Sequence, residues 1–313
     1  MKDKKVVFMG TPEYSVPVLE MLIENTNVIG VVTQPDKLVG RKKVLTPCPV
    51  KEVAIKNNIP VLSPVKLKDE YQSIIDLNPD IIITCAYGQI LPEELIYAPK
   101  YDTVNVHASL LPKYRGGAPI HHAIINGEKE TGITIMFTDK GMDSGDTITK
   151  QVLPIGENDT YDVISKKMSK IGANLLREVL PQIFNKTCKR EKQNDEEKTI
   201  ANVIKREDEH LDFNKSAKEV HNKIRGLSSI PGAYAVLDDN QIKIYLSSLE
   251  NCNMVNKILP GTITRTDKDS IYIACSDQEI RILKIQISGK KQMSVRDYLN
   301  GQKNNTLKGK VLK

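Results

Sequence analysis

The sequence of 313 residues contains no tryptophan, only 5% aromatic residues and no long run of apolar side chains. A helix that crosses a membrane needs roughly 18 or more consecutive apolar residues, and no run approaches that length. The first run, Val6–Gly10, follows a lysine-rich start and is too short for the core of a signal peptide. We therefore expect a chain without membrane spans that works in the cytoplasm.

Cysteine is scarce and irregularly spaced. The cysteines are odd in number and form no CxxC pair; they are Cys48, Cys85, Cys188, Cys252 and Cys275. Disulfide frameworks and zinc sites need paired or closely spaced thiols, so we predict neither, and no metal. His121 and His122 do not change this prediction, because neighbouring side chains on a helix point about 100° apart.

The glycine-rich turn of dinucleotide-binding proteins is missing as well. Gly10-Thr11-Pro12-Glu13 stands where such proteins place GxGxxG after their first strand. Pro12 also removes one of the backbone N–H groups that would hold a phosphate. We therefore do not expect a nicotinamide cofactor.

Positive charge is concentrated in the second half of the chain. The net charge of +6 comes entirely from residues 205–313, because residues 1–204 carry equal numbers of basic and acidic side chains. Such asymmetry is typical of a domain that binds a polyanion, although a solvated lysine-rich tail would look the same.

The first 184 residues alternate short runs rich in valine and isoleucine with helical patterns. Nearly continuous apolar runs indicate parallel strands that are buried on both faces. We predict strands at Val6–Met9, Val28–Thr33, Ile81–Cys85, Thr103–Val106 and Ile133–Thr138. We predict helices at Ser15–Glu24, Pro49–Asn57, Lys68–Leu77, Ala118–Ile125 and Tyr161–Phe184. This order predicts an α/β domain, residues 1–184, with an open, mostly parallel, Rossmann-like sheet between helices.

A polar stretch separates this domain from a second pattern. Residues 185–204 are charged and nearly free of apolar side chains over most of their length, and we predict a linker there. Residues 205–313 begin with a helix at Ser216–Gly226, which Ser216 can cap. Short strands separated by polar turns follow, at Tyr234–Leu237, Gln241–Ser247, Gly261–Arg265, Ser270–Cys275 and Glu279–Ser288. They predict a smaller OB-like β-barrel.

Three polar residues suggest the chemistry. Asn105 and His107 are two apart on a predicted strand, so both side chains face the same way at its carboxyl end. Asp143 follows the next predicted strand and meets His107 if the two strands are neighbours. An amide can donate to an oxyanion, and a histidine beside a carboxylate can move a proton. The group therefore suits direct acyl transfer to an external amine, unless Ser109 serves as a nucleophile. The alternative is that all three residues only cap or form turns.

The segment Asn105-x-His107-x-Ser109-Leu110-Leu111-Pro112, with Arg115-Gly116 and Asp143 downstream, resembles the signature of folate-dependent formyltransferases. Further segments resemble the members that act on methionyl-tRNA: Met9–Glu13, Gln34–Lys37 with Gly40-Arg41, Tyr87–Pro92 and Pro231–Ala233. The resemblance spans both predicted domains. It implies that Asn105, His107 and Asp143 are catalytic and that no metal takes part.

The resemblance also implies the substrates and their contacts. The donor would be 10-formyltetrahydrofolate, held by Ser109, Leu110, Leu111 and Pro112, with Tyr87, Ile90 and Leu91 beside the pterin. The acceptor would be the α-amino group of the methionine on initiator tRNA. Arg41, Lys42 and Lys43 lie in a basic loop, Gln34–Pro49, which would contact the tRNA, as basic loops bind phosphates and probe open bases. By itself the loop could equally be an ordinary charged surface loop. We expect a monomer.

Two other interpretations share some of these features. A formyltransferase for a sugar nucleotide or another small amine would keep the same Asn, His and Asp. The basic loop and the basic C-terminal half favour RNA instead. A non-enzymatic RNA-binding protein would have no need for the three residues in register.

Overall fold

The computed structural model describes residues 1–40, 43–301 and 307–313, which fold into two compact units. The N-terminal unit comprises Met1–Pro119, Thr131–Pro154 and Ser165–Asn202, and the C-terminal unit comprises Ile120–Glu130, Ile155–Ile164 and Val203–Lys313. These units differ from the predicted division at residues 184 and 204, because two N-terminal segments pack with the second unit and most of the predicted linker packs with the first.

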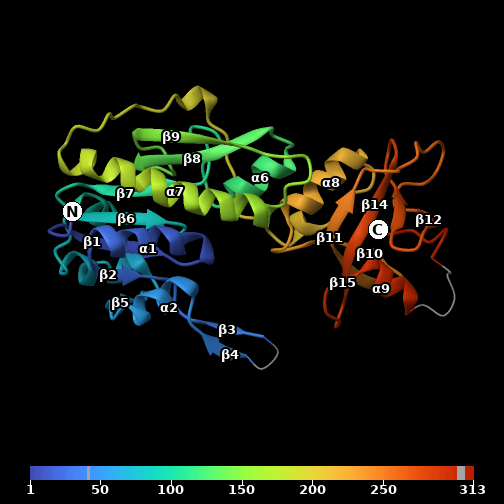
Figure 1. Cartoon of the computed structure of the whole chain (residues 1–313), viewed down its shortest axis with the longest axis horizontal. Coiled ribbons are helices and arrows are strands. Elements are labelled where there is room, and N and C mark those ends of the chain that lie inside the picture. The colour runs from blue at the N-terminus through green and yellow to red at the C-terminus, as the bar shows by residue number, and fades with distance from the viewer. Residues whose placement is uncertain (41–42, 302–306) are drawn as a thin grey trace. The chain divides into compact units, whose positions relative to one another are not determined.

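The described part of the N-terminal unit contains a seven-stranded sheet (Figure 1) with the order β5-β2-β1-β6-β7-β8-β9. Its strands are β1 (Lys5–Gly10), β2 (Asn27–Val32), β5 (Val61–Leu62), β6 (Ile81–Cys85), β7 (Thr103–His107), β8 (Glu130–Phe137) and β9 (Thr147–Pro154). The pairs from β5 to β7 are parallel, and β8 runs antiparallel to β7. The sheet confirms the predicted open, mostly parallel architecture.

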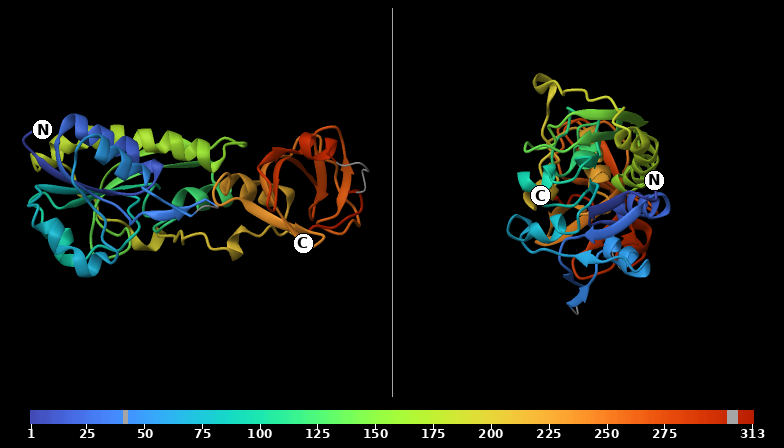
Figure 2. Two further views of the ribbon diagram at one scale, coloured as in Figure 1. Left: turned by 90° about the horizontal axis from the view of Figure 1, so that it is seen from below. Right: turned by 90° about the vertical axis from the view of Figure 1, so that its left-hand side faces the viewer.

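Helices cover both faces of this sheet, and this double coverage explains the continuous apolar runs. On one face, Val7 and Met9 pack with side chains of α3 (Leu67–Glu70), α4 (Gln72–Ile75) and α5 (Glu93–Tyr97). The other face carries α1 (Val16–Asn25) and α7 (Tyr161–Phe184), as the two views of Figure 2 show. Here Gly172 of α7 lies against Val106 of β7, where an added Cβ would be 2.8 Å from a methyl group. The helix α2 (Pro49–Lys56) also belongs to this unit, whereas α6 (Pro119–Ile125) belongs, except for its first residue, to the C-terminal unit.

Several short elements differ from the predictions. The single helix expected at Lys68–Leu77 is divided into α3 and α4, because i→i+3 hydrogen bonds from Asp69 and Ile74 tighten the chain on either side of Tyr71. The expected basic loop contains a hairpin of β3 (Lys37–Val39) and β4 (Val44–Thr46). The strands β5 and β9 and the helix α5 were not predicted.

The C-terminal unit is an antiparallel barrel-like sheet, as predicted. It consists of β10 (Ala233–Leu237), β11 (Asn240–Ser248), β12 (Ile263–Thr266), β13 (Ile271–Ala274), β14 (Glu279–Ile287) and β15 (Met293–Ser294). The end of the chain bridges the two edges, since Ile263 donates to the Lys310 carbonyl while Val236 and Lys313 exchange backbone hydrogen bonds. This closure pairs polar groups that an open edge would leave exposed.

Two helices pack with the barrel. The helix α8 (Ala217–Gly226) begins at Ser216, whose hydroxyl accepts the Glu219 amide in a capping box, and ends at Gly226, as the sequence predicts. The helix α9 (Val295–Asn300) is a further element that was not predicted.

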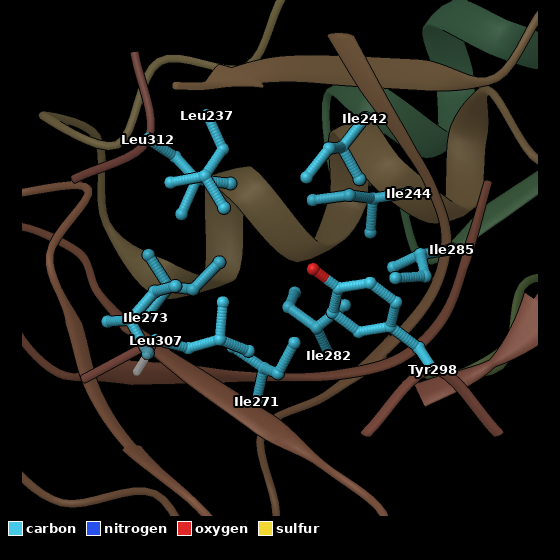
Figure 3. Close-up of a pocket in the computed structure, with 11 residues that line it drawn as sticks. Leu237, Ile242, Ile244, Ile271, Ile273, Ile282, Ile285, Tyr298, Leu307 and Leu312 are labelled. Atoms are coloured by element: carbon cyan, nitrogen blue, oxygen red, sulfur yellow. The ribbon is translucent and has the colours of Figure 1, made fainter. Parts of the chain in front are cut away.

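The barrel interior encloses a small apolar cavity (Figure 3). Aliphatic side chains of the strands line it, together with Leu307, Leu312 and Tyr298 of α9, whose hydroxyl points inward. The cavity holds none of the predicted site residues. It is a property of the barrel core.

Candidate functional site

The strand β7 presents Asn105 and His107 on the same side near its carboxyl end. The strand lies between β6 and β8, with Asn105 opposite Thr84 of β6 and His107 opposite Thr134 of β8, which holds their backbone between two neighbouring strands. The His107 side chain is 5% exposed, and Asn105 is half-buried. These two positions are rigid because they belong to the centre of a packed sheet.

Asp143 completes the group from the loop between β8 and β9. Its Oδ1 accepts from Asn105 Nδ2 at 3.4 Å, and its Oδ2 lies 3.6 Å from His107 Nδ1. The same Oδ2 accepts the Gly116 backbone N–H at 2.8 Å. The structure therefore brings the three predicted catalytic residues together around one carboxylate.

The loop that carries Asp143 is tightly folded. Asp143 has a positive φ of 49°, a conformation that aspartate tolerates better than most residues. Asp139 Oδ1 accepts from the Gly141 amide and from the Ser144 hydroxyl. A Cβ on Gly145 would lie 2.0 Å from the Phe137 carbonyl oxygen. The loop therefore holds its carboxylate in one place.

The hydrogen bonds of His107 define where its ring proton sits. Nε2 lies 3.1 Å from the carbonyl oxygen of Tyr114. A carbonyl oxygen can only accept, so Nε2 carries a proton. Nδ1 is then the nitrogen that can take up or release a proton beside Asp143. In this arrangement His107 can accept or release a proton at Nδ1.

The predicted folate segment is anchored on β8. Thr134 Oγ1 donates to the Ser109 carbonyl at 2.7 Å and accepts the Leu111 amide at 3.1 Å. Lys150 Nζ donates to the Leu111 carbonyl at 2.7 Å. The Ser109 hydroxyl is buried and donates to the Lys113 carbonyl at 2.6 Å. Ser109 thus shapes this turn, and the geometry gives no support to a nucleophilic role.

The remaining predicted folate residues differ in exposure. Leu110 and Pro112 are half-buried, and Ile90 is 87% exposed. Leu91 is half-buried against the core cluster under α3 and α5.

Tyr87 does not present its ring to this surface. The ring is 4% exposed within the same core cluster, and its hydroxyl has no hydrogen-bond partner among the residues described. Burial raises the pKa of Tyr87 to about 12. Its carbonyl oxygen accepts from Thr11 Oγ1 and Gln34 Nε2. Because the ring is buried, Tyr87 can contact a ligand only through its backbone atoms.

The predicted basic loop is a hairpin with apolar sides. Leu38, Val39, Val44 and Leu45 are each more than half exposed on β3 and β4. Lys43 is exposed with a positive φ of 48°. Arg41 and Lys42, the other predicted tRNA contacts, lie outside the residues that the structure describes.

The predicted linker takes part in the site. Residues 191–201, here called the strap, run along the N-terminal unit as the yellow segment between α7 and α8 (Figure 1). The strap is joined to β9 by paired backbone hydrogen bonds between Thr147 and Glu191. The Thr199 hydroxyl accepts the amide of Tyr114, the residue whose carbonyl binds His107. Only its polar composition was visible in the sequence, so its contacts were missed.

His121, the first of the two adjacent histidines, is held by contacts within the fold. The His121 ring stacks on Tyr161, with centroids 3.9 Å apart, and its Nδ1 donates to the Gly226 carbonyl at 2.7 Å. Burial lowers the pKa of His121. Among residues 1–40, 43–301 and 307–313, no group of three or more His, Cys, Asp or Glu side chains could hold a metal ion. Within the same ranges, no helix is both long and apolar enough to cross a membrane.

Comparison with known proteins identifies the class to which this fold and site belong. Residues 4–180 match the Formyl transferase family, and residues 203–303 match the family described as Formyl transferase, C-terminal domain. The chain therefore belongs to the formyl transferase family, which confirms the resemblance seen in the sequence.

Within that family, the similarity is high to proteins of one kind. A methionyl-tRNA formyltransferase of Staphylococcus aureus strain MW2 is 50% identical over 311 residues, which cover 98% of this chain and 99% of the relative.

Solved structures share the fold at lower identity. An N-formyltransferase from Helicobacter canadensis, in complex with folinic acid and dTDP-3-aminofucose, is 22% identical with a TM-score of 0.65; the match covers 89% of this chain and 98% of that one. HypX from Aquifex aeolicus, in complex with tetrahydrofolic acid, is 15% identical with a TM-score of 0.65; the match covers 96% of this chain and 47% of that one.

Proposed function

We propose that this protein transfers the formyl group of 10-formyltetrahydrofolate to the α-amino group of methionine on initiator tRNA. The observation that carries the proposal is the convergence of Asn105, His107 and Asp143 in a chain that is 50% identical, over nearly its whole length, to a methionyl-tRNA formyltransferase. We also propose that it acts in the cytoplasm as a monomer.

The chemistry follows from the properties of these side chains. The amine nitrogen attacks the formyl carbon and a tetrahedral oxyanion forms; the bond from that carbon to N10 of the folate then breaks. The Asn105 amide has two N–H groups, so it can donate one to Asp143 and direct the other at the oxyanion. The amine loses one proton, which His107 and Asp143 accept, and N10 gains one.

The folate would lie against the segment Ser109–Pro112. Its backbone is held by Thr134 and Lys150, so it offers a fixed edge next to His107. Ile90 and Leu91 would provide apolar contacts for the pterin. Tyr87 would contribute backbone atoms. A rigid folate site raises the rate most in a reaction of two substrates, because the bound substrates are already oriented and need no productive collision.

The tRNA would contact the hairpin and the basic C-terminal part of the chain, residues 205–313. Arg41, Lys42 and Lys43, which stand between β3 and β4 in the sequence, supply positive charge, and the exposed apolar side chains of β3 and β4 can pack against open bases. The lysines of the second unit would bind phosphates and position the acceptor without reading its sequence.

The assignment is tested by offering three amine acceptors side by side with labelled 10-formyltetrahydrofolate: methionyl-initiator tRNA, free methionine and a sugar-nucleotide amine. We expect label only on the charged tRNA. Label on the sugar nucleotide would assign a different acceptor, and release of free formate alone would contradict transfer.

The roles of the three residues are tested by substitution. We expect Asn105→Ala and Asp143→Ala to lower kcat by at least about 10²-fold, because each removes an oxyanion donor or a proton acceptor. Affinity for the charged tRNA, measured by filter binding, should stay within about twofold. Equal losses of tRNA affinity and turnover would show that these residues only maintain the fold.

A further inference from the structure

The side chain of Gln193 in the strap makes four hydrogen bonds around the candidate site. Its Oε1 accepts from Arg115 Nε at 3.0 Å and from Arg115 Nη2 at 2.8 Å. Its Nε2 donates to the backbone carbonyls of Asp143 and Gly145, both at 2.8 Å. An amide side chain has two donors and two acceptor lone pairs, so every one of them is used.

These contacts fix the loop that carries the carboxylate. The Asp143 and Gly145 carbonyls lie at the two ends of a tight turn, and both are held by one NH₂ group. On the other side, Gln193 holds the buried guanidinium of Arg115, which also pairs with Asp195 at 2.8 Å. Arg115 is next to Gly116, whose N–H binds the Asp143 carboxylate. Gln193 therefore connects the backbone of Asp143 to the turn that binds its side chain.

We propose that Gln193 is a positioning residue for formyl transfer, which holds the Asp143 carboxylate in reach of Asn105 and His107. This inference rests on the proposed function, since it assigns the effect to the same reaction. Gln193 does not touch the reacting atoms. Its influence runs through Arg115 and the backbone of the Asp143 loop.

The sharpest test is Gln193→Glu, which keeps the shape of the side chain. One carboxylate oxygen can still accept from Arg115, but the other faces two carbonyl oxygens without a proton to share. We expect kcat to fall by about 10²-fold with KM for both substrates changed less than threefold, because a displaced catalytic group costs rate more than binding. The ratio of variant to native kcat should rise as the pH is lowered and the new carboxyl takes up a proton.

Two further variants separate positioning from folding. Gln193→Met preserves the volume without hydrogen bonds or charge, and it should lower kcat while Tm stays within about 3 °C of the native protein. Lys192→Gln changes the exposed neighbouring residue and should leave both unaltered. If kcat falls in the Glu and Met variants only in proportion to the fraction of unfolded protein, the positioning role is overturned.

Hydrogen exchange of peptides that cover residues 139–146 provides a readout that does not depend on activity. We expect faster exchange in Gln193→Met than in Lys192→Gln. If the native protein does not formylate any acceptor but exchange still rises, the proposed function fails and the contact of Gln193 with the loop stands. Native turnover together with unchanged kcat and unchanged exchange in both Gln193 variants would overturn the inference.

Discussion

At the scale of single residues, the site depends on backbone groups as much as on side chains. Gly116 has a φ of +119°, and a Cβ at this position would lie 2.7 Å from the Ala201 carbonyl oxygen of the strap. Only glycine fits there without moving the backbone. The N–H that binds Asp143 is therefore available because this residue has no side chain.

Substitution of Gly116 by alanine should reduce turnover. The strap or the turn must shift, so the hydrogen bond from Gly116 to Asp143 is weakened, and we expect kcat to fall about 10²-fold. The rate of formyl transfer measures the effect, with Tm recorded in parallel. Gly301→Ala is the matched control, because its φ is negative and a Cβ there makes only ordinary contacts. A native rate in Gly116→Ala would show that the backbone donor has no catalytic importance.

Some of these site residues could be predicted from the sequence, and others could not. Asn105 and His107 stand two apart on a buried strand, and this spacing alone predicts that their side chains lie on the same side. Asp143 could be placed only because β8 proved to be the neighbour of β7. Gln193 is one polar residue in a polar segment, and its partners are 48 to 78 positions away. Local pattern carries no information about such contacts.

At the scale of elements, the buried strands were predicted correctly, whereas very short or largely exposed strands such as β5, β3 and β9 were not. The run Val6–Met9 is buried on both faces, and its continuous apolar sequence clearly predicts a strand. The hairpin of β3 and β4 has only three residues in each strand, and its apolar side chains face solvent, so no periodicity distinguishes it from a loop. Pattern analysis therefore misses elements that are too short or too exposed to show a burial periodicity.

The helix α8 gives the C-terminal unit a dependence on pH. His221 on this helix is buried; its Nε2 donates to the Glu157 carbonyl at 3.2 Å, and its Nδ1 accepts from the Ser247 hydroxyl at 2.9 Å. Burial lowers the pKa of His221 below its ordinary value of 6.5. Below that value the unfolded chain binds a proton that the folded chain excludes, so stability is complete above 6.5 and declines as the pH falls toward the lowered pKa.

We expect the free energy of unfolding of this unit to decrease between pH 7 and pH 5. The His221→Gln variant should be less stable at pH 7 and should show a shallower decline, because the contribution of His221 is lost while that of His121, whose pKa burial also lowers, remains. Urea unfolding followed by hydrogen exchange in α8 measures both slopes. Parallel slopes in the native and variant proteins would rule out His221 as the source.

At the scale of the whole molecule, positive charge is unevenly distributed along the sequence. The surplus of six positive charges lies in residues 205–313, including the exposed Lys290 and Lys291 after β14. Each lysine that neutralises a phosphate releases counterions, so affinity for tRNA should fall steeply as salt increases. This distribution is consistent with the proposal that residues 205–313 bind the polyanion.

Removal of two of these charges should change the dependence on salt. We expect the double variant Lys290→Gln, Lys291→Gln to bind tRNA more weakly and to lower the slope of log K against log salt by about one to two. The matched control changes a pair of neighbouring lysines, Lys166 and Lys167 on α7, in the same way; they lie within residues 1–204, whose net charge is zero. An unaltered slope in the Lys290→Gln, Lys291→Gln variant would show that these two charges serve solubility and not tRNA binding.

The strap also restricts how this chain can be rearranged. It leads to the last point at which the chain passes from one unit to the other, and Gln193 and Thr199 within it hold parts of the candidate site. A fragment ending at residue 184 would keep the sheet but lose these contacts. A protease that cut the strap would abolish activity while both units stayed folded. Recombination that grafts a new C-terminal module onto this catalytic body should therefore preserve activity only when the junction falls after residue 202.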